Sequence, residues 1–271
     1  MSAETTLDAV PAAWAAALIE SDRRYFEAGA EVLAFPGASI AVLRGAESLA
    51  AGCVAQRIDV GCAAAAPDSW LAELEGRFRD LGASRVRLYL EGAHGTLDAA
   101  LARRGYRRRV EHGFVRECGG PAEDPGVELV SSDDDDGWIV RRELLRRSGS
   151  APDGFAADPD LWIDMERRRT RAGYMRPYLV RRGGDVVGAA CAASAGPLLR
   201  IKNVCVDPAH RRSGVATALA VRFADLAASQ GFAAAGCFAI EGEAGMGIYG
   251  RAGYRDLTSQ LEWVSNLGSR T

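Results

Sequence analysis

Apolar positions recur along the second half of the chain at the spacing of helices. Residues 215–229 carry apolar side chains at spacings of 4, 4 and 3, which predicts a helix with one buried face. The side chains on that face are Val215, Leu219, Phe223 and Leu226. Residues 138–147 and 161–171 predict two further helices, and the acidic run 133–136 suits the start of the first, because carboxylates are favoured at a helix N-terminus. Near the start of the chain, the alanine-rich stretch around Trp14 predicts another amphipathic helix.

Short apolar runs between these helices predict the strands of a sheet. Residues 178–182 and 185–193 flank Gly183 and Gly184, a pair typical of a hairpin turn. Residues 198–206 predict the next strand. Strands and helices that follow one another in this way indicate an α/β fold.

The two halves of the chain carry similar series of elements. Each has a strand-like run, a helical stretch, a Gly-Tyr-Arg turn and a last strand, in that order. In the first half the strands and the turn are residues 85–90, 105–107 and 112–116; in the second half they are 233–238, 253–255 and 260–264. Self-similarity of this kind predicts a duplicated α/β unit.

A break in composition separates the two halves. Residues 117–126 hold two prolines and three glycines and show no apolar periodicity, which is typical of an interdomain linker. The length of 271 residues also suits two small domains. We therefore expect an N-terminal domain over residues 1–118, a linker over 119–126 and a C-terminal domain over 127–271.

Charge and cysteine content argue against several classes of protein. The net charge of −3 and the pI near 5.8 argue against a dedicated nucleic-acid binder. No stretch reaches the roughly 20 apolar residues that span a membrane. Six scattered cysteines without a C-x-x-C pair, with three histidines, predict neither a disulfide framework nor a metal site. Glu4 and Asp8 stand where a secretory signal would carry positive charge, so we expect a cytoplasmic protein.

Arginine greatly outnumbers lysine in this chain. Lys202 is the only lysine, so 33 basic residues less this one leave 32 arginines. Two interpretations stay open: codon bias in a GC-rich genome, or recognition of phosphate or carboxylate groups by guanidinium forks.

The stretch after the strand 198–206 has the pattern of a phosphate-binding loop. An Asp-Pro pair turns the chain, and a short polar loop enters the predicted helix through Gly214. The first turn of a helix presents backbone N–H groups without intrahelical partners, together with the positive end of the helix dipole. Gly214 lets an anion approach the backbone, and Arg211 and Arg212 add positive charge. The spacing differs from the motifs of nucleotide hydrolases and dinucleotide-binding proteins, so both of those classes are disfavoured.

Two motifs in this half resemble a known family. Arg211, Gly214 and Ala216 match the Q/R-x-x-G-x-G/A signature of the GCN5-related N-acetyltransferase (GNAT) superfamily, and residues 248–254 are similar to its L-Y-x-x-x-G-F/Y segment. The resemblance covers about residues 126–266 and reaches the first half only through the repeat. It implies an α/β fold of two tandem GNAT domains, each a mixed, mostly antiparallel twisted sheet flanked by helices. The layout is similar to that of mycothiol synthases and glycine N-acyltransferases.

The resemblance implies roles for particular residues. The acyl donor is acetyl-CoA, a co-substrate, and no metal is expected. Its diphosphate binds the backbone of the loop and first helical turn, at Arg211, Arg212, Ser213, Gly214, Val215, Ala216 and Thr217. The pantetheine arm and thioester carbonyl bind the strand backbone, at Val204, Cys205 and Val206. Tyr249 matches the residue that protonates the departing CoA thiolate, and a packed core tyrosine is the alternative interpretation.

The sequence departs from the family pattern at the general base. Lys202 stands where many members have a glutamate, and Gly242 replaces an asparagine. Glu241 and Glu243 lie beside that position, either as a base or as exposed loop acids, so the base is unassigned. Cys205 is close to the site in sequence and is interpreted as a buried strand thiol rather than a nucleophile.

The first half lacks the matching machinery. Residues 66–71 read Ala-Pro-Asp-Ser-Trp-Leu where the phosphate loop is expected, and Leu101 replaces Tyr249. The proline removes a backbone N–H, and the aspartate repels a diphosphate. We expect that this domain does not bind CoA productively, and that it shapes the acceptor pocket or serves as a scaffold.

Together these expectations describe an N-acetyltransferase. The acetyl group of acetyl-CoA passes to a primary amine of a small molecule in a ternary complex, with the C-terminal domain catalytic. A non-catalytic acyl-CoA sensor or scaffold is the alternative, and transfer to a protein or an aminoacyl-tRNA is a third interpretation. We expect no nucleic-acid or membrane partner, and monomer and homodimer stay open. The acceptor is expected at residues 138–171 and 257–260, where Asp164 and Glu166 either hold a cationic amine or lie on a solvated helix face.

Overall fold

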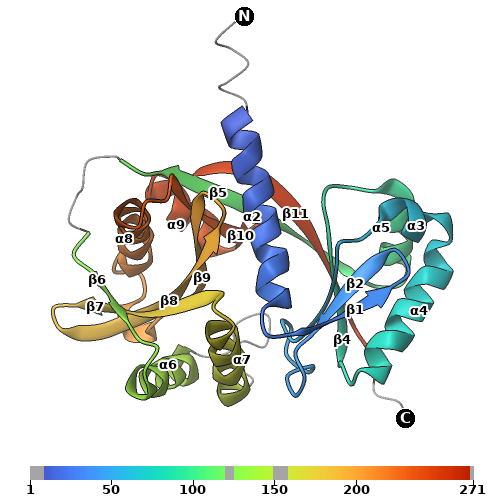
Figure 1. The fold of residues 1–271 in the computed structure, drawn as a ribbon, viewed down its shortest axis with the longest axis horizontal. Coiled ribbons are helices and arrows are strands. Elements are labelled where there is room, and N and C mark those ends of the chain that lie inside the picture. The colour runs from blue at the N-terminus through green and yellow to red at the C-terminus, as the bar shows by residue number, and fades with distance from the viewer. Residues whose placement is uncertain (1–8, 120–124, 149–157, 269–271) are drawn as a thin grey trace, which may run out of the picture.

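Eleven strands form one sheet flanked by helices in the part of the chain that the structure, a computed structural model, describes: residues 9–119, 125–148 and 158–268 (Figure 1). Residues 120–124 of the expected linker lie outside this part. The elements of the first half are α2 (Ala9–Glu27), β1 (Glu31–Phe35), β2 (Ala38–Val42), β3 (Cys53–Gln56), α3 (Val60–Ala65), α4 (Pro67–Asp80), β4 (Arg85–Leu90), α5 (Gly95–Arg103) and β5 (Arg107–Glu117). Those of the second half are β6 (Glu128–Ser131), α6 (Asp135–Ser148), α7 (Pro159–Arg171), β7 (Met175–Arg182), β8 (Asp185–Ala195), β9 (Leu198–Val206), the 3₁₀ turn Pro208–His210, α8 (Val215–Ser229), β10 (Ala234–Ile240), α9 (Ala244–Arg251) and β11 (Arg255–Asn266).

The helices and the hairpin predicted in the second half are confirmed. The predicted ranges 198–206 and 215–229 coincide with β9 and α8, and the hairpin turns through glycines 183 and 184 between β7 and β8. The helix predicted to start at residue 161 begins earlier, at Pro159. The side chain of Asp158 caps it, since a carboxylate oxygen accepts a hydrogen bond of 2.9 Å from the backbone N–H of Leu161.

The repeated turn is present in both halves. Gly105 follows α5 and Gly253 follows α9, and both have a φ of +79°, a conformation that favours glycine. A long strand follows each turn, β5 in the first half and β11 in the second.

The two halves exchange these last strands. The order of strands in the sheet is β1-β2-β3-β4-β11-β5-β10-β9-β8-β7-β6. Strand β5 from the first half pairs with β10, while β11 from the second half pairs with β4, and the two exchanged strands pair antiparallel with each other. The hydrogen-bonded sheet therefore runs without interruption from one half into the other, which the sequence did not predict.

Helix α2 lies at the junction of the two halves (Figure 1). It packs against β2, β5 and β11 on one side of the junction and against β8 and β9 on the other. Its Leu18 is fully buried among Val115, Leu198 and Ala234. This helix, the first in the part of the chain that the structure describes, is therefore part of the covering of the second half's sheet.

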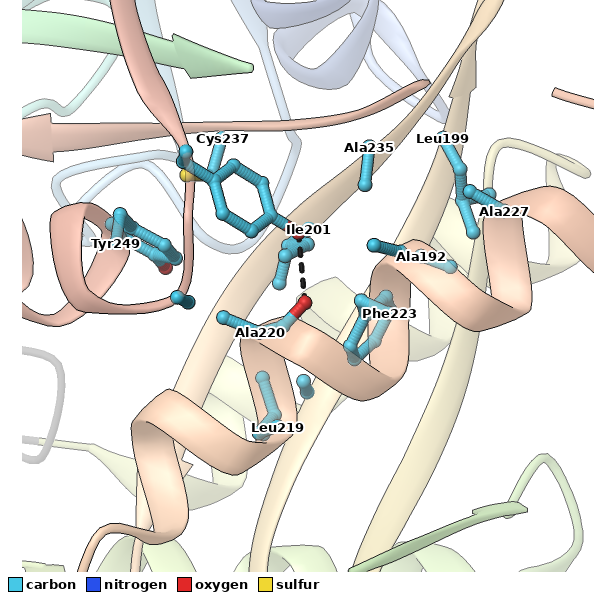
Figure 2. Packing of buried hydrophobic residues seen from close by; sticks show 14 of the residues in the cluster. Ala192, Leu199, Ile201, Leu219, Ala220, Phe223, Ala227, Ala235, Cys237 and Tyr249 are labelled. Atoms are coloured by element: carbon cyan, nitrogen blue, oxygen red, sulfur yellow. Dashed lines mark hydrogen bonds between the residues drawn. The ribbon is translucent and has the colours of Figure 1, made fainter. Parts of the chain in front are cut away.

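Helix α8 covers one face of the second half's sheet. Leu219 and Phe223, two of its predicted core residues, are fully buried, and Figure 2 shows them on the side of α8 that faces Leu199 and Ile201. The hydroxyl of Tyr254 donates a hydrogen bond of 2.8 Å to the carbonyl oxygen of Ala220 in the same cluster. Among the described residues, no helix is both long and apolar enough to cross a membrane.

Candidate active site

Strands β9 and β10 diverge in the middle of the sheet. They pair in parallel at three positions, from Leu198 with Ala234 to Arg200 with Gly236. Beyond these positions β9 continues to Val206, and in the described residues its pairing is with β8. The divergence leaves the backbone of residues 204–206 available on the side that faces β10.

A cleft of about 270 Å³ opens where these strands separate. Its walls come from both halves of the chain: from α2, β4 and β5 of the first half, and from α7, β9, β10 and α9 of the second. The residues that line it include Tyr25, Phe26, Arg87, Glu111, Trp162, Lys202, Val204, Glu243 and Tyr249.

The loop before α8 presents the free start of that helix. Gly214 is the N-cap with a φ of +83°, and among the described residues no side chain caps the helix. A Cβ at Gly214 would meet no described atom within 4 Å, so the space beside the backbone is open. Arg212 is also left-handed, with a φ of 60°, and its side chain is exposed. This geometry suits an anion at the first turn of α8.

Arg211 holds the loop in place. Its guanidinium donates hydrogen bonds to the carbonyl oxygens of Val206, at 3.3 Å, and Ser148, at 2.7 Å. Arg182 donates to the carbonyl oxygen of Ser213 at 3.0 Å. Both arginines that the sequence assigned to the diphosphate are exposed, and Arg211 also fixes the loop to α6.

Tyr249 belongs to the hydrophobic core and also lines the cleft, so the structure combines the two alternatives that the sequence left open. It is 8% exposed, it packs against Phe114 and Tyr254, and it also lines the cleft. Figure 2 shows it at one end of the core cluster that α8 covers. Burial raises the pKa of the phenol well above its ordinary value, with a further contribution from Cys237, so the hydroxyl keeps its proton at neutral pH.

A charged cluster is centred on Asp22 of α2. Its members Arg200, Lys202 and Glu111 line the cleft, whereas Asp22 and Gln260 line a second cleft, in the first half. One oxygen of Asp22 accepts hydrogen bonds from Arg200 and Lys202, each at 2.6 Å, and the other accepts from Gln260 at 2.6 Å. Gln260 also donates to Glu111 at 2.9 Å. The cluster thus joins α2, β9, β11 and β5 behind the cleft.

The cluster shifts the pKa values of its members. Burial would raise the pKa of Asp22, but Arg200 and Lys202 outweigh it and hold the pKa well below its usual range. Burial and Arg200 lower the pKa of Lys202 to about 8, against the opposing effect of Asp22. Burial and the carboxylates of Asp22 and Glu262 raise the pKa of Glu111 to about 6.

Comparison with known proteins finds a family match in this half of the chain. Residues 140–254 match the model of the acetyltransferase (GNAT) family. We refer to this segment as the GNAT domain, after the family model that it matches. It contains the diverging strands, the loop before α8 and Tyr249.

Solved structures of low sequence identity share the fold over most of the chain. A GCN5-related N-acetyltransferase from Kribbella flavida is 16% identical, with a TM-score of 0.62, over 94% of this chain and 97% of that one. One from Sphaerobacter thermophilus is also 16% identical, with a TM-score of 0.62, over 85% of this chain and 76% of that one. A tandem GNAT protein from the clavulanic acid biosynthesis pathway is 13% identical, with a TM-score of 0.52, over 86% of this chain and 79% of that one. No curated protein matches the chain by sequence.

The interpretation of Glu166 as a solvated helix residue is wrong. Glu166 is 1% exposed, and Arg141 donates to its carboxylate at 2.6 Å. Its other oxygen accepts hydrogen bonds from Trp162, at 3.0 Å, and Asn203, at 2.8 Å. Asp164 pairs with an arginine one turn later on α7 and is partly exposed. Neither acid is among the described residues that line the cleft, and Glu166 binds Trp162 and Asn203, which do.

The acids beside Gly242 lie at different places in the GNAT domain. Glu241 is 63% exposed and faces His112 at 3.8 Å, whereas Glu243 lines the cleft. Cys205 is buried, and burial raises the pKa of its thiol, which fits the interpretation as a strand thiol.

The first half has a related but altered cleft. Its parallel strands β3 and β4 meet at one position, Ala55 with Leu88, and a cleft of about 250 Å³ opens beyond it. Arg57 at its mouth is bound by carboxylates of Glu20, at 2.7 Å, and Glu27, at 2.8 Å. The next helix, α3, is capped by its own Asp59, which accepts from two backbone N–H groups of the first turn.

The sequence missed the residues that the first half brings to the GNAT domain's cleft. Tyr25 and Phe26 come from α2, and Arg87 and Glu111 come from strands of the first half. Asp22 of α2 lines the other cleft and accepts a hydrogen bond from Lys202 of this one. An unusual acid within the last strand of the repeat was the one local signal, since Glu111 directly precedes the predicted run 112–116.

Proposed function

We propose that the GNAT domain transfers an acetyl group from acetyl-CoA to a primary amine of a small molecule, by direct attack in a ternary complex. The proposal rests on one combination: β9 and β10 diverge at the cleft that Tyr249 lines, and the chain runs from the end of β9 through a short loop into the start of α8, which no described side chain caps. Acetyl-CoA needs these three partners, for its pantetheine arm, its diphosphate and its leaving sulfur.

The donor would bind along the GNAT domain's own backbone. The N–H groups at residues 211–217 hold the diphosphate, because a helix start offers unpaired donors and a positive dipole end. Backbone groups of residues 204–206 pair with the pantetheine arm and polarise the thioester carbonyl. Tyr249 gives its proton to the departing thiolate, and its raised pKa keeps that proton available at neutral pH.

The acceptor would bind in the part of the cleft that the first half completes. Tyr25, Phe26 and Trp162 supply aromatic surface, and Glu111 supplies a carboxylate. Because the pKa of Glu111 is about 6, this carboxylate is mostly ionised at neutral pH. A cationic amine on an apolar body fits that combination. The first half thus shapes the acceptor pocket, and its own cleft does not bind CoA productively.

The cysteines support a reducing compartment. All six are free thiols, and Cys53, Cys191, Cys205 and Cys237 are buried. Proteins of oxidising compartments commonly pair such residues. We therefore place the enzyme in the cytoplasm, as the sequence also predicts.

One observation favours a second candidate function, an acyl-CoA sensor without turnover. Lys202 occupies the position of the glutamate that many GNAT enzymes use as a base, and it is bound to Asp22. A sensor would bind acetyl-CoA and release no CoA on addition of an amine.

Acetyl-CoA binding by a matched pair of glycine variants tests the donor site. Gly214 and Gly231 stand at opposite ends of α8, with φ of +83° and +79°, and neither would bring a Cβ within 4 Å of a described atom. Gly214→Asp places a carboxylate against the diphosphate and should weaken binding by about tenfold or more, measured by calorimetry. Gly231→Asp carries the same charge and backbone strain and should bind like the wild type. Equal binding by both variants would refute the site.

A further inference from the structure

Lys202 is the only amine side chain in the chain, and it lies in the acyl-transfer cleft. It stands on β9 beyond the last pairing with β10, two residues before Val204. Asn203, the next residue, has a φ of 53°, and the register with β8 shifts at this point. This irregularity breaks the regular alternation of side chains along the strand where the cleft opens.

The ammonium of Lys202 is held within reach of the cleft. Its side chain is 19% exposed, and Nζ lies 2.6 Å from Asp22 Oδ1 and 4.1 Å from the centre of the Tyr25 ring. Tyr249, the proposed proton donor to the leaving sulfur, lines the same cleft. A thioester bound beside Tyr249 would therefore share its cleft with the amine of Lys202.

The charged and titratable groups around Lys202 come from α2, β9 and β5, and Lys202 pairs in the sheet with Cys191 of β8. Asp22 and Tyr25 belong to α2, Arg200 to β9 itself and Glu111 to β5. Asp22 shares one oxygen between Lys202 and Arg200, so its charge neutralises Lys202 only in part. With a pKa of about 8, the side chain is a neutral amine in a substantial fraction of molecules slightly above neutral pH.

We propose that Lys202 is a site of self-acetylation, which fills the acceptor cleft when acetyl-CoA is bound and no acceptor amine is present. This inference rests on the proposed function, because it uses the same donor and the same cleft. Its chemical class is acyl transfer to a protein amine.

The step is balanced with acetyl-CoA as the only co-reactant. The lone pair of the neutral Nζ attacks the acetyl carbonyl carbon, an N–C bond forms and the C–S bond breaks. The nitrogen loses one proton to solvent, and the departing sulfur takes one from Tyr249, which regains a proton from solvent. The products are an acetamide on Lys202 and CoA thiol.

The acetamide on Lys202 persists because an amide is a poor acyl donor, and it would block the acceptor cleft. Acetylation removes the charge of Lys202 and its ion pair with Asp22, while Arg200 and Gln260 keep their hydrogen bonds to that carboxylate. The added acetyl group takes up space in a cleft of about 270 Å³. Excess donor without acceptor would therefore silence the protein.

Mass spectrometry of the intact chain tests the inference. The protein is incubated with acetyl-CoA and no amine, and peptides are then mapped to separate Lys202 from the N-terminal amine. We expect one acetyl group on Lys202, added faster as the pH rises toward 8 and reaching a plateau above it. An added acceptor amine should slow the reaction.

Three variants show whether bound acetyl-CoA is the donor. Lys202→Arg keeps the cation and should gain no acetyl group at this position. Gly214→Asp should slow the acetylation of Lys202 by about tenfold or more, and Gly231→Asp should leave it unchanged. An equal rate in Gly214→Asp and the wild type would overturn the inference, since the acetylation would then be adventitious.

The outcomes separate this inference from the proposed function. If the wild type binds acetyl-CoA and releases CoA with an amine, but Lys202 stays unmodified without one, self-acetylation is wrong and the enzyme stands. If acetyl-CoA does not bind, both proposals are wrong.

Discussion

At the scale of single residues, burial and neighbouring charges set the protonation states of Tyr249 in the cleft and of Asp22 beside it. Tyr249 keeps its proton because it is buried, and Asp22 keeps its negative charge because Arg200 and Lys202 surround it. These two effects have opposite directions, and both follow from the balance between desolvation and nearby charge. The proposed proton donor, Tyr249, and the group that stays charged, Asp22, are therefore different side chains.

Tyr249→Phe tests the proton donor. Loss of the hydroxyl should lower kcat by about 10²-fold and change the KM for acetyl-CoA little, because the group acts on the leaving sulfur. Tyr254→Phe is the matched control, since Tyr254 is buried beside Tyr249 and its hydroxyl bonds Ala220. That variant should lose about 1 kcal/mol of stability and keep kcat. Full activity in Tyr249→Phe would reduce Tyr249 to a core residue.

The lowered pKa of Lys202 predicts a pH dependence of stability. Below about pH 8 both the folded and unfolded chains hold the proton, and the folded state bears the whole cost of the buried charge. Between pH 8 and the ordinary pKa of 10.5 the unfolded chain holds more protons, so the free energy of unfolding rises with pH. In urea titrations the wild type should gain up to about 3 kcal/mol relative to Lys202→Arg across this range. A difference that stays constant with pH would contradict the shift.

At the scale of elements, the local hydrophobic pattern predicted most helices and strands of the second half, but it did not predict the exchange of β5 and β11 between the halves. The ranges of β9 and α8 follow from their apolar spacing, which depends on neighbouring residues alone. The exchange of β5 and β11 has no local signal, because both strands follow the same Gly-Tyr-Arg turn and present similar patterns. Glu166 was misplaced for the same reason, since its burial depends on Arg141 and Asn203 from other elements.

Gly113 tests the packing where the exchanged strands meet. An added Cβ would lie 2.6 Å from Thr258 Cγ2, 2.9 Å from Leu18 Cδ2 and 3.1 Å from Phe238 Cε1, so β11, α2 and β10 crowd it together. Gly113→Ala should lower the free energy of unfolding by about 1–3 kcal/mol. Gly76→Ala, inside α4 with no described atom within 4 Å of its Cβ, should raise it by about 0.5–1 kcal/mol. Denaturant titration measures both, and equal stability of the two variants would refute the crowding.

At the scale of the whole molecule, the two halves form one site. The GNAT domain supplies the loop proposed to bind the donor and Tyr249, while α2, β4 and β5 contribute to the wall of the cleft that Tyr249 lines. The motif of the donor loop was readable from the sequence because it is contiguous. The wall proposed for the acceptor was not, because Tyr25, Arg87 and Glu111 belong to three different elements, α2, β4 and β5, that meet only in the fold.

Release of CoA thiol measures the acetyl transfer to an amine that we propose for this composite cleft. The wild type is mixed with acetyl-CoA and each of a panel of small primary amines, and CoA thiol is measured against the reaction without amine. We predict sustained release, many turnovers per protein molecule, with at least one amine that pairs a cation with an aromatic or apolar body. Tight binding of acetyl-CoA without sustained release for any amine would contradict the claim and indicate a sensor.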